Sequence, residues 1–81
     1  MNLPRVAVYS RPGCHLCERL IEELAPHVRG RARVEVRNID TQAQWQRRFG
    51  TRIPVVEIDG CVICEYTLDI DAVERALSTS P

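Results

Sequence analysis

The sequence predicts a small α/β domain in which a four-stranded mixed sheet carries helices on both faces, in the order β-α-β-α-β-β-α. Short apolar runs alternate with segments whose apolar residues recur at helical spacing. An Asp-Gly pair between two of the apolar runs predicts a tight hairpin. The 81 residues are enough for one core, so we expect a single domain over residues 1–81.

The first predicted strand, residues 5–9, is apolar almost throughout, which is typical of a central strand covered on both faces. Pro12 and Gly13 end it. The first predicted helix begins at about Cys14 and ends near Gly30, a residue suited to a left-handed helix end. One apolar face of this helix is formed by Cys17, Leu20, Ile21, Leu24 and Val28.

Residues 33–39 alternate between valines and charged residues, which predicts a strand near a sheet edge with its two valines on the drier face. Asp40 or Thr41 is expected to cap a short helix that stops at Gly50. Both strand–helix–strand units are expected to be right-handed parallel crossovers.

The pair at residues 59–60 is expected to join a strand over residues 55–58 to one that runs from Cys61 to Glu65 or Tyr66, as a two-residue hairpin. Asp69 is expected to cap a last helix over residues 70–77.

The chemistry is expected at Cys14 and Cys17, where the first strand gives way to the first helix. Unpaired N–H groups and a partial positive charge at a helix N-terminus favour thiolate over thiol, and thiolate is the species that attacks disulfides. We expect Cys14 to be the exposed attacking thiolate and Cys17 the more buried resolving thiol. Parallel crossovers would aim this loop at the carboxyl edge of the sheet, where α/β folds hold their sites.

His15 and Cys64 are candidate modulators of this pair. A cationic His15 would favour the thiolate, with an exposed spacer of little effect as the alternative. Cys61 and Cys64 lie three apart in a strand, so they should face opposite ways and not bridge. Val55 is expected opposite Cys64, at the active-site edge. Cys64 would then be a third redox thiol, a thiol that receives a disulfide from the main pair, or a small buried apolar residue.

The 11 basic and 11 acidic residues balance, so no charge pattern points to nucleic acid. No apolar run approaches the roughly 18 residues of a membrane span. Pro4 and Arg5 interrupt any secretory signal pattern. We therefore expect a cytoplasmic monomer with neither nucleic acid nor membrane as a partner.

Two segments resemble the glutaredoxin branch of the thioredoxin-fold family, and the resemblance extends over nearly the whole chain. They are Tyr9-Ser10-Arg11-Pro12-Gly13-Cys14-His15-Leu16-Cys17, and Ile39-Asp40 followed by Phe49-Gly50-Thr51-Arg52-Ile53-Pro54-Val55-Val56-Glu57-Ile58-Asp59-Gly60. The Cys-His-Leu-Cys-Glu form is similar to that of short bacterial glutaredoxin-like proteins.

The resemblance implies a thioredoxin-like fold of the glutaredoxin type and a substrate site around the cysteines. It implies a cis Ile53–Pro54 bond and backbone pairing of Ile53 with a substrate peptide. Arg11 takes the place of a lysine that approaches a glutathione carboxylate. Leu16 replaces the usual aromatic residue and is a candidate substrate contact.

The function implied is that of a thiol–disulfide oxidoreductase that reduces protein disulfides or glutathione mixed disulfides. Glutathione is then a candidate co-substrate, and no resident cofactor or metal is expected. The family's Gly-Gly pair after the last strand is replaced by the stretch Ile63-Cys64-Glu65-Tyr66. Two alternatives are a module that binds and delivers a metal ion or iron–sulfur cluster through the same thiols, and a partner-docking domain.

Overall fold

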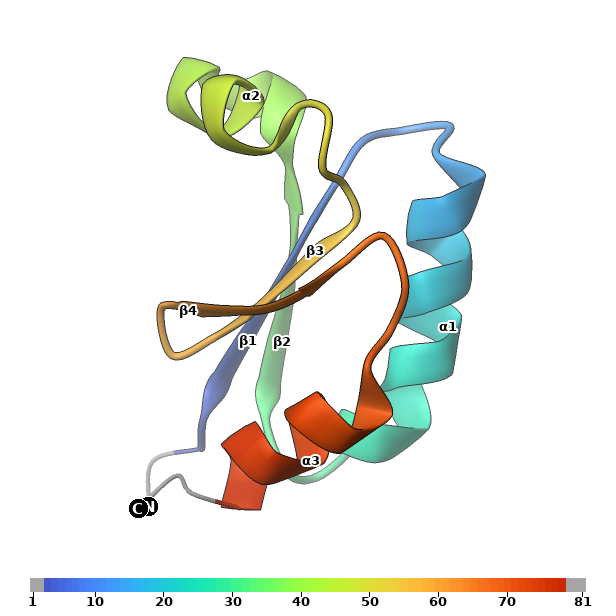
Figure 1. Ribbon diagram of the computed structural model, residues 1–81, viewed down its shortest axis with the longest axis vertical. Coiled ribbons are helices and arrows are strands. Elements are labelled where there is room, and N and C mark those ends of the chain that lie inside the picture. The colour runs from blue at the N-terminus through green and yellow to red at the C-terminus, as the bar shows by residue number, and fades with distance from the viewer. Residues whose placement is uncertain (1–2, 79–81) are drawn as a thin grey trace.

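The computed structural model describes residues 3–78, which form a four-stranded sheet flanked by helices (Figure 1). The elements are β1 (Arg5–Ser10), α1 (His15–Val28), β2 (Arg33–Asn38), the 3-10 helix η1 (Ile39–Thr41), α2 (Ala43–Phe49), β3 (Val55–Ile58), β4 (Cys61–Glu65) and α3 (Ile70–Ser78). This confirms the predicted order of strands and α-helices. Residues 1, 2 and 79–81 of the expected domain lie outside the described residues.

The strand order is β2-β1-β3-β4, so β1 is paired along both of its edges. Its pairing with β2 is parallel, whereas β1 with β3 and β3 with β4 are antiparallel. The prediction of a second parallel crossover is therefore wrong. Helix α2 has 7 residues and spans about 10 Å, whereas the 6 residues of β2 span about 20 Å. So short a helix cannot carry the chain back to the end of the sheet where β1 and β2 begin. Strand β3 therefore starts at the end where β1 and β2 finish, and it runs antiparallel to β1.

Helices cover both faces of the sheet, as predicted. Helices α1 and α3 bury one cluster against the sheet: Val6, Val8, Leu20, Leu24, Val28, Val56, Ile58, Val73 and Leu77. Helix α2 and η1 bury a smaller cluster on the other face: Ala7, Tyr9, Ile39, Phe49 and Val55. Alternate residues of β1 thus belong to different cores, which is why its sequence is apolar throughout.

The edge strand β2 differs from the prediction, because its two valines are exposed. Val34 is 45% and Val36 51% exposed. They pair with Val6 and Val8 of β1, which lie in the α1 core. The helix packs its buried residues over the central strands and leaves β2 uncovered.

The start of α2 also differs from the prediction. Asn38 caps η1 by accepting a 2.9 Å hydrogen bond from the Asp40 N–H, and the hydroxyl of Thr41 donates to the Asn38 carbonyl. Gln42 precedes α2 without a side-chain cap. The expected cap at Asp40 or Thr41 is wrong because the Asp40 carboxylate binds Arg11 instead.

The hairpin forms as predicted, with positive φ at both Asp59 (47°) and Gly60 (87°). Its register breaks between Val56 and Glu57, so that β4 carries one extra residue and Cys64 pairs with Val56. The expected pairing of Cys64 with Val55 is therefore wrong.

Phe49 is fully buried, and its ring centroid lies 4.3 Å from that of Tyr9. We expect Phe49→Ala to lower the free energy of unfolding by about 3–5 kcal/mol, because it leaves a cavity in the smaller core. Urea unfolding followed by circular dichroism measures this. Val62→Ala on the exposed side of β4 is the control and should cost under about 0.5 kcal/mol. Equal losses in the two variants would contradict the assignment of Phe49 to the core.

Candidate active site

Four parts of the chain meet at one edge of the sheet because of the strand registers. Ser10 at the end of β1 pairs with Asn38 at the end of β2. Tyr9 pairs with Val55, so the residues before β3 lie across from the end of β1. Val55 in turn pairs with Glu65 at the end of β4. The loop after β1, the start of η1, the approach to β3 and the exit from β4 therefore share one neighbourhood.

Cys14 and Cys17 are joined by a disulfide at the start of α1, with their Cα atoms 5.2 Å apart. Cys14 is the N-cap of the helix, and its sulfur accepts a 3.2 Å hydrogen bond from the Cys17 N–H. Cys14 is partly exposed, whereas Cys17 is 1% exposed and packs in the interior. The two sulfurs thus differ in access and in contact with the helix N-terminus, and both differences favour Cys14 as the attacking thiol.

The two residues between the cysteines point outward. The His15 side chain is almost fully exposed, with Nδ1 3.8 Å from a carboxylate oxygen of Glu18. Leu16 is 57% exposed. Leu16 also lines a groove of about 280 Å³ between the first turns of α1 and the segment after β4. An exposed leucine beside the disulfide is available to a partner, and its role as a substrate contact stays a prediction.

The peptide bond between Ile53 and Pro54 is cis, as the resemblance implied. Pro54 is buried, and its carbonyl accepts a 2.8 Å hydrogen bond from the Tyr66 N–H. Within residues 3–78, neither the N–H nor the carbonyl of Ile53 has a hydrogen-bond partner. Unpaired backbone groups just before a strand can pair with an extended peptide, which is the part that the resemblance implied for Ile53.

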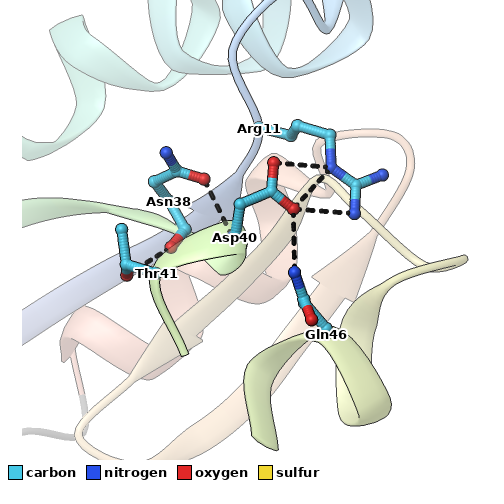
Figure 2. A network of polar contacts seen from close by, with 5 residues as sticks. All are labelled: Arg11, Asn38, Asp40, Thr41 and Gln46. Atoms are coloured by element: carbon cyan, nitrogen blue, oxygen red, sulfur yellow. Dashed lines mark hydrogen bonds and ion pairs between the residues drawn. The ribbon is translucent and has the colours of Figure 1, made fainter. Parts of the chain in front are cut away.

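The guanidinium group of Arg11 is bound to the carboxylate of Asp40 (Figure 2). Its Nε lies 3.1 Å from both carboxylate oxygens of Asp40, and its Nη2 lies 3.0 Å from Oδ1. Gln46 of α2 donates a further 3.2 Å hydrogen bond to Asp40. The hydrogen bonds from Arg11, and then from Gln46, lower the pKa of the Asp40 carboxyl group. The loop before Cys14 is thereby tied to η1 and α2.

A second arginine at the same edge is also paired. Arg52 forms an ion pair with Glu65, whose Oε2 atom is buried. The next residue, Tyr66, has a positive φ of 66° and donates its hydroxyl hydrogen bond to the carbonyl of Thr51. Tyr66 also lines the groove that Leu16 borders. The exit from β4 is thus bound to the approach to β3 by side chains as well as by the backbone.

The other two cysteines, Cys61 and Cys64, have different surroundings. Cys61 is exposed beside the hairpin, whereas Cys64 packs against the larger core. Burial raises the pKa of the Cys64 thiol, and a backbone hydrogen bond with Asp69 offsets part of this. Among residues 3–78, no group of three or more His, Cys, Asp or Glu side chains is arranged to hold a metal ion.

A family model described as a glutaredoxin-like domain (DUF836) matches residues 5–78. The chain belongs to this glutaredoxin-like domain family. Among curated proteins, none matches the chain at a significant level. Family membership, together with the disulfide between Cys14 and Cys17, indicates a redox function for this glutaredoxin-like domain.

Several solved structures resemble the glutaredoxin-like domain. Target protein XcR50 from X. campestris is 28% identical, with 94% of this chain and 99% of that chain covered and a TM-score of 0.70. Oxidised mitochondrial thioredoxin 3 from Saccharomyces cerevisiae is 16% identical, with coverages of 99% and 81% and a TM-score of 0.68. A mutant of the thioredoxin-like protein BC3987 is 22% identical, with coverages of 93% and 96% and a TM-score of 0.62. The fold is therefore thioredoxin-like. None of the helices described between residues 3 and 78 has the length and apolarity of a membrane span.

Sequence reasoning missed the groups that surround Arg11. Asp40 was expected to cap a helix, and Gln46 was assigned no part. One signal was available, because parallel pairing of the first two strands brings the residues just after them together. Tyr66 was noted only as part of the stretch that replaces a glycine pair, and its position on the groove wall follows from the register after the bulge.

The lowered pKa of Asp40 predicts how the Arg11 pair responds to pH. The pair stabilises the fold fully above the unfolded pKa of about 3.9, and this contribution is lost as the pH falls through the lower folded pKa. We expect Arg11→Gln to raise the pKa of Asp40, as measured by carboxyl ¹³C titration in NMR spectra. Arg31→Gln, which breaks a remote pair with Glu74, is the control and should leave the Asp40 titration in place. The same Asp40 titration in the wild type and in Arg11→Gln would contradict the assignment.

The two free cysteines should label at different rates in the oxidised protein. Cys61 is exposed, whereas burial both shields the Cys64 thiol and raises its pKa. We expect N-ethylmaleimide at pH 7.5 to modify Cys61 at least about ten times faster than Cys64. Peptide mapping by mass spectrometry distinguishes the two sites, and urea-unfolded protein gives the reference in which both react. Faster labelling of Cys64 in the folded protein would contradict this.

Proposed function

We propose that this glutaredoxin-like domain is a dithiol–disulfide oxidoreductase in which Cys14 attacks and Cys17 resolves. The observation that carries the proposal is the asymmetry of the pair. Cys14 is partly exposed and its sulfur accepts a hydrogen bond from a backbone N–H at the N-terminus of α1, whereas Cys17 is buried. Such a donor and the partial positive charge of the helix favour the thiolate of Cys14.

The reaction begins from the reduced dithiol. The Cys14 thiolate attacks one sulfur of a substrate disulfide, forms a mixed disulfide, and releases the other substrate sulfur as a thiolate that takes up a proton. The thiolate of Cys17 then attacks the Cys14 sulfur and releases the second substrate thiol. Two electrons pass from the dithiol to the substrate, and the Cys14–Cys17 disulfide remains. An external thiol or dithiol reductant restores the starting state.

The surrounding residues support this cycle by holding the substrate. The unpaired backbone groups of Ile53 suit an extended peptide that adds to the sheet edge. Leu16 supplies apolar contact surface next to the reacting sulfur. A peptide held at both points would lie across Cys14, in keeping with attack on a disulfide within that peptide.

We expect Cys14→Ser to abolish reduction of a disulfide-linked peptide, because the attacking sulfur is absent. Cys17→Ser should retain the first attack and accumulate a mixed disulfide with one half of the peptide. Single-turnover reactions of dithiothreitol-reduced protein, stopped with acid and analysed by intact mass, measure both outcomes. Cys61→Ser is the matched control and should react like the wild type. A Cys14→Ser protein that exchanges at the wild-type rate would refute the assigned roles.

A further inference from the structure

Two arginines at the rim of the disulfide site are each held by a carboxylate of the same chain. Arg11 makes N–O contacts of 3.0 to 3.1 Å with both oxygens of Asp40. Arg52 forms an ion pair with Glu65, which has one oxygen buried. Each guanidinium thus has an acidic partner already, and the four charges sum to zero.

This arrangement disfavours glutathione as a ligand of the site. At neutral pH glutathione carries two carboxylates and one ammonium group, so its recognition calls for unpaired cations. A glutathione carboxylate that approached Arg11 would have to displace Asp40 and would be repelled by it, and the same holds for Arg52 and Glu65. Like charges placed against a competing ligand are a general source of specificity.

The same rim fits an uncharged, extended polypeptide. Within residues 3–78, Ile53 offers an unpaired N–H and an unpaired carbonyl, which bind any peptide backbone irrespective of side-chain charge. The adjoining groove of about 280 Å³ has apolar walls at Leu16, Tyr66 and Leu68. In the described part of the chain, the groove has two charged lining residues, Arg19 and Glu23, whose charges cancel.

We propose that Asp40 and Glu65 are specificity-determining residues that direct the domain toward disulfides of polypeptides and away from glutathione disulfides. This rests on the function proposed above, because it assigns a substrate class to the same Cys14 site. Each carboxylate acts through the arginine that it binds, not on the reacting sulfurs.

The test replaces each carboxylate by its neutral isostere. Asp40→Asn and Glu65→Gln keep the size of the side chain and leave the partner arginine with an uncompensated charge. Glu74→Gln is the matched control, because it breaks the 2.9 Å ion pair between Glu74 of α3 and Arg31 in the turn that follows α1. Reduced proteins are mixed with oxidised glutathione, or with a disulfide-linked neutral peptide whose termini are blocked. Acid quenching and intact mass give a second-order rate constant for each.

The measured quantity is the rate constant for oxidised glutathione divided by that for the blocked peptide. We expect Asp40→Asn and Glu65→Gln each to raise this ratio by about 2- to 5-fold, the size expected for one partly exposed charge contact. Added salt should shrink the rise, because it screens the uncovered charge. Glu74→Gln should leave the ratio at the wild-type value. An unchanged ratio in both site variants, or an equal rise in the control, would overturn the proposal.

A binding measurement separates this proposal from the function on which it rests. S-methylglutathione carries both carboxylates and cannot exchange, so NMR titration reports its affinity without redox chemistry. We expect it to bind Asp40→Asn and Glu65→Gln about 2- to 5-fold more tightly than the wild type. Equal binding to all three would overturn the specificity proposal. Failure of the reduced wild type to react with either disulfide would instead refute the proposed oxidoreductase function.

Discussion

The pairing of β1 along both edges is the constraint on which the rest of the site depends. Pairing with β3 holds the backbone of β1 as far as Tyr9, and pairing with β2 holds it as far as its last residue, Ser10. The chain then turns at Gly13, whose φ of 79° is a conformation that other residues rarely adopt, and enters α1 with Cys14 as the cap. The position of the sulfur relative to the sheet is therefore set by backbone hydrogen bonds. Its chemistry is set by the helix that follows.

The interactions that stabilise the fold differ from those between the charged side chains around the disulfide. Two buried clusters, one on each face of the sheet, supply the hydrophobic stabilisation. The ion pairs at the rim are partly exposed, and solvent screening leaves such pairs only a small contribution to stability. Because each pair adds little to the stability of the fold, a change of charge at Asp40 or Glu65 should leave the domain folded. The selectivity that we propose for Asp40 and Glu65 is therefore separable from the cysteine pair and its helix.

Local pattern was enough to predict the succession of elements and the position of the cysteine pair. Apolar periodicity, the glycines and the Asp-Gly hairpin all act over a few residues, and the structure follows them. The errors arose where distant segments meet. The antiparallel entry of β3 depends on the short reach of α2, and the pairing of Cys64 with Val56 depends on one extra residue in β4. The ion pair of Arg11 with Asp40 joins the ends of two strands, and neither end alone reveals its partner.

Tyr66 holds a left-handed backbone conformation at the exit from β4. A left-handed conformation costs a non-glycine residue about 1–2 kcal/mol, and glycine would adopt the observed φ of 66° without that cost. The conformation persists because the Tyr66 N–H binds the Pro54 carbonyl and its hydroxyl binds the Thr51 carbonyl. A glycine here would keep the backbone bond and lose only the side chain. That side chain and Leu16 line the same groove, so the positive φ occurs where the wall of the groove beside the disulfide is formed.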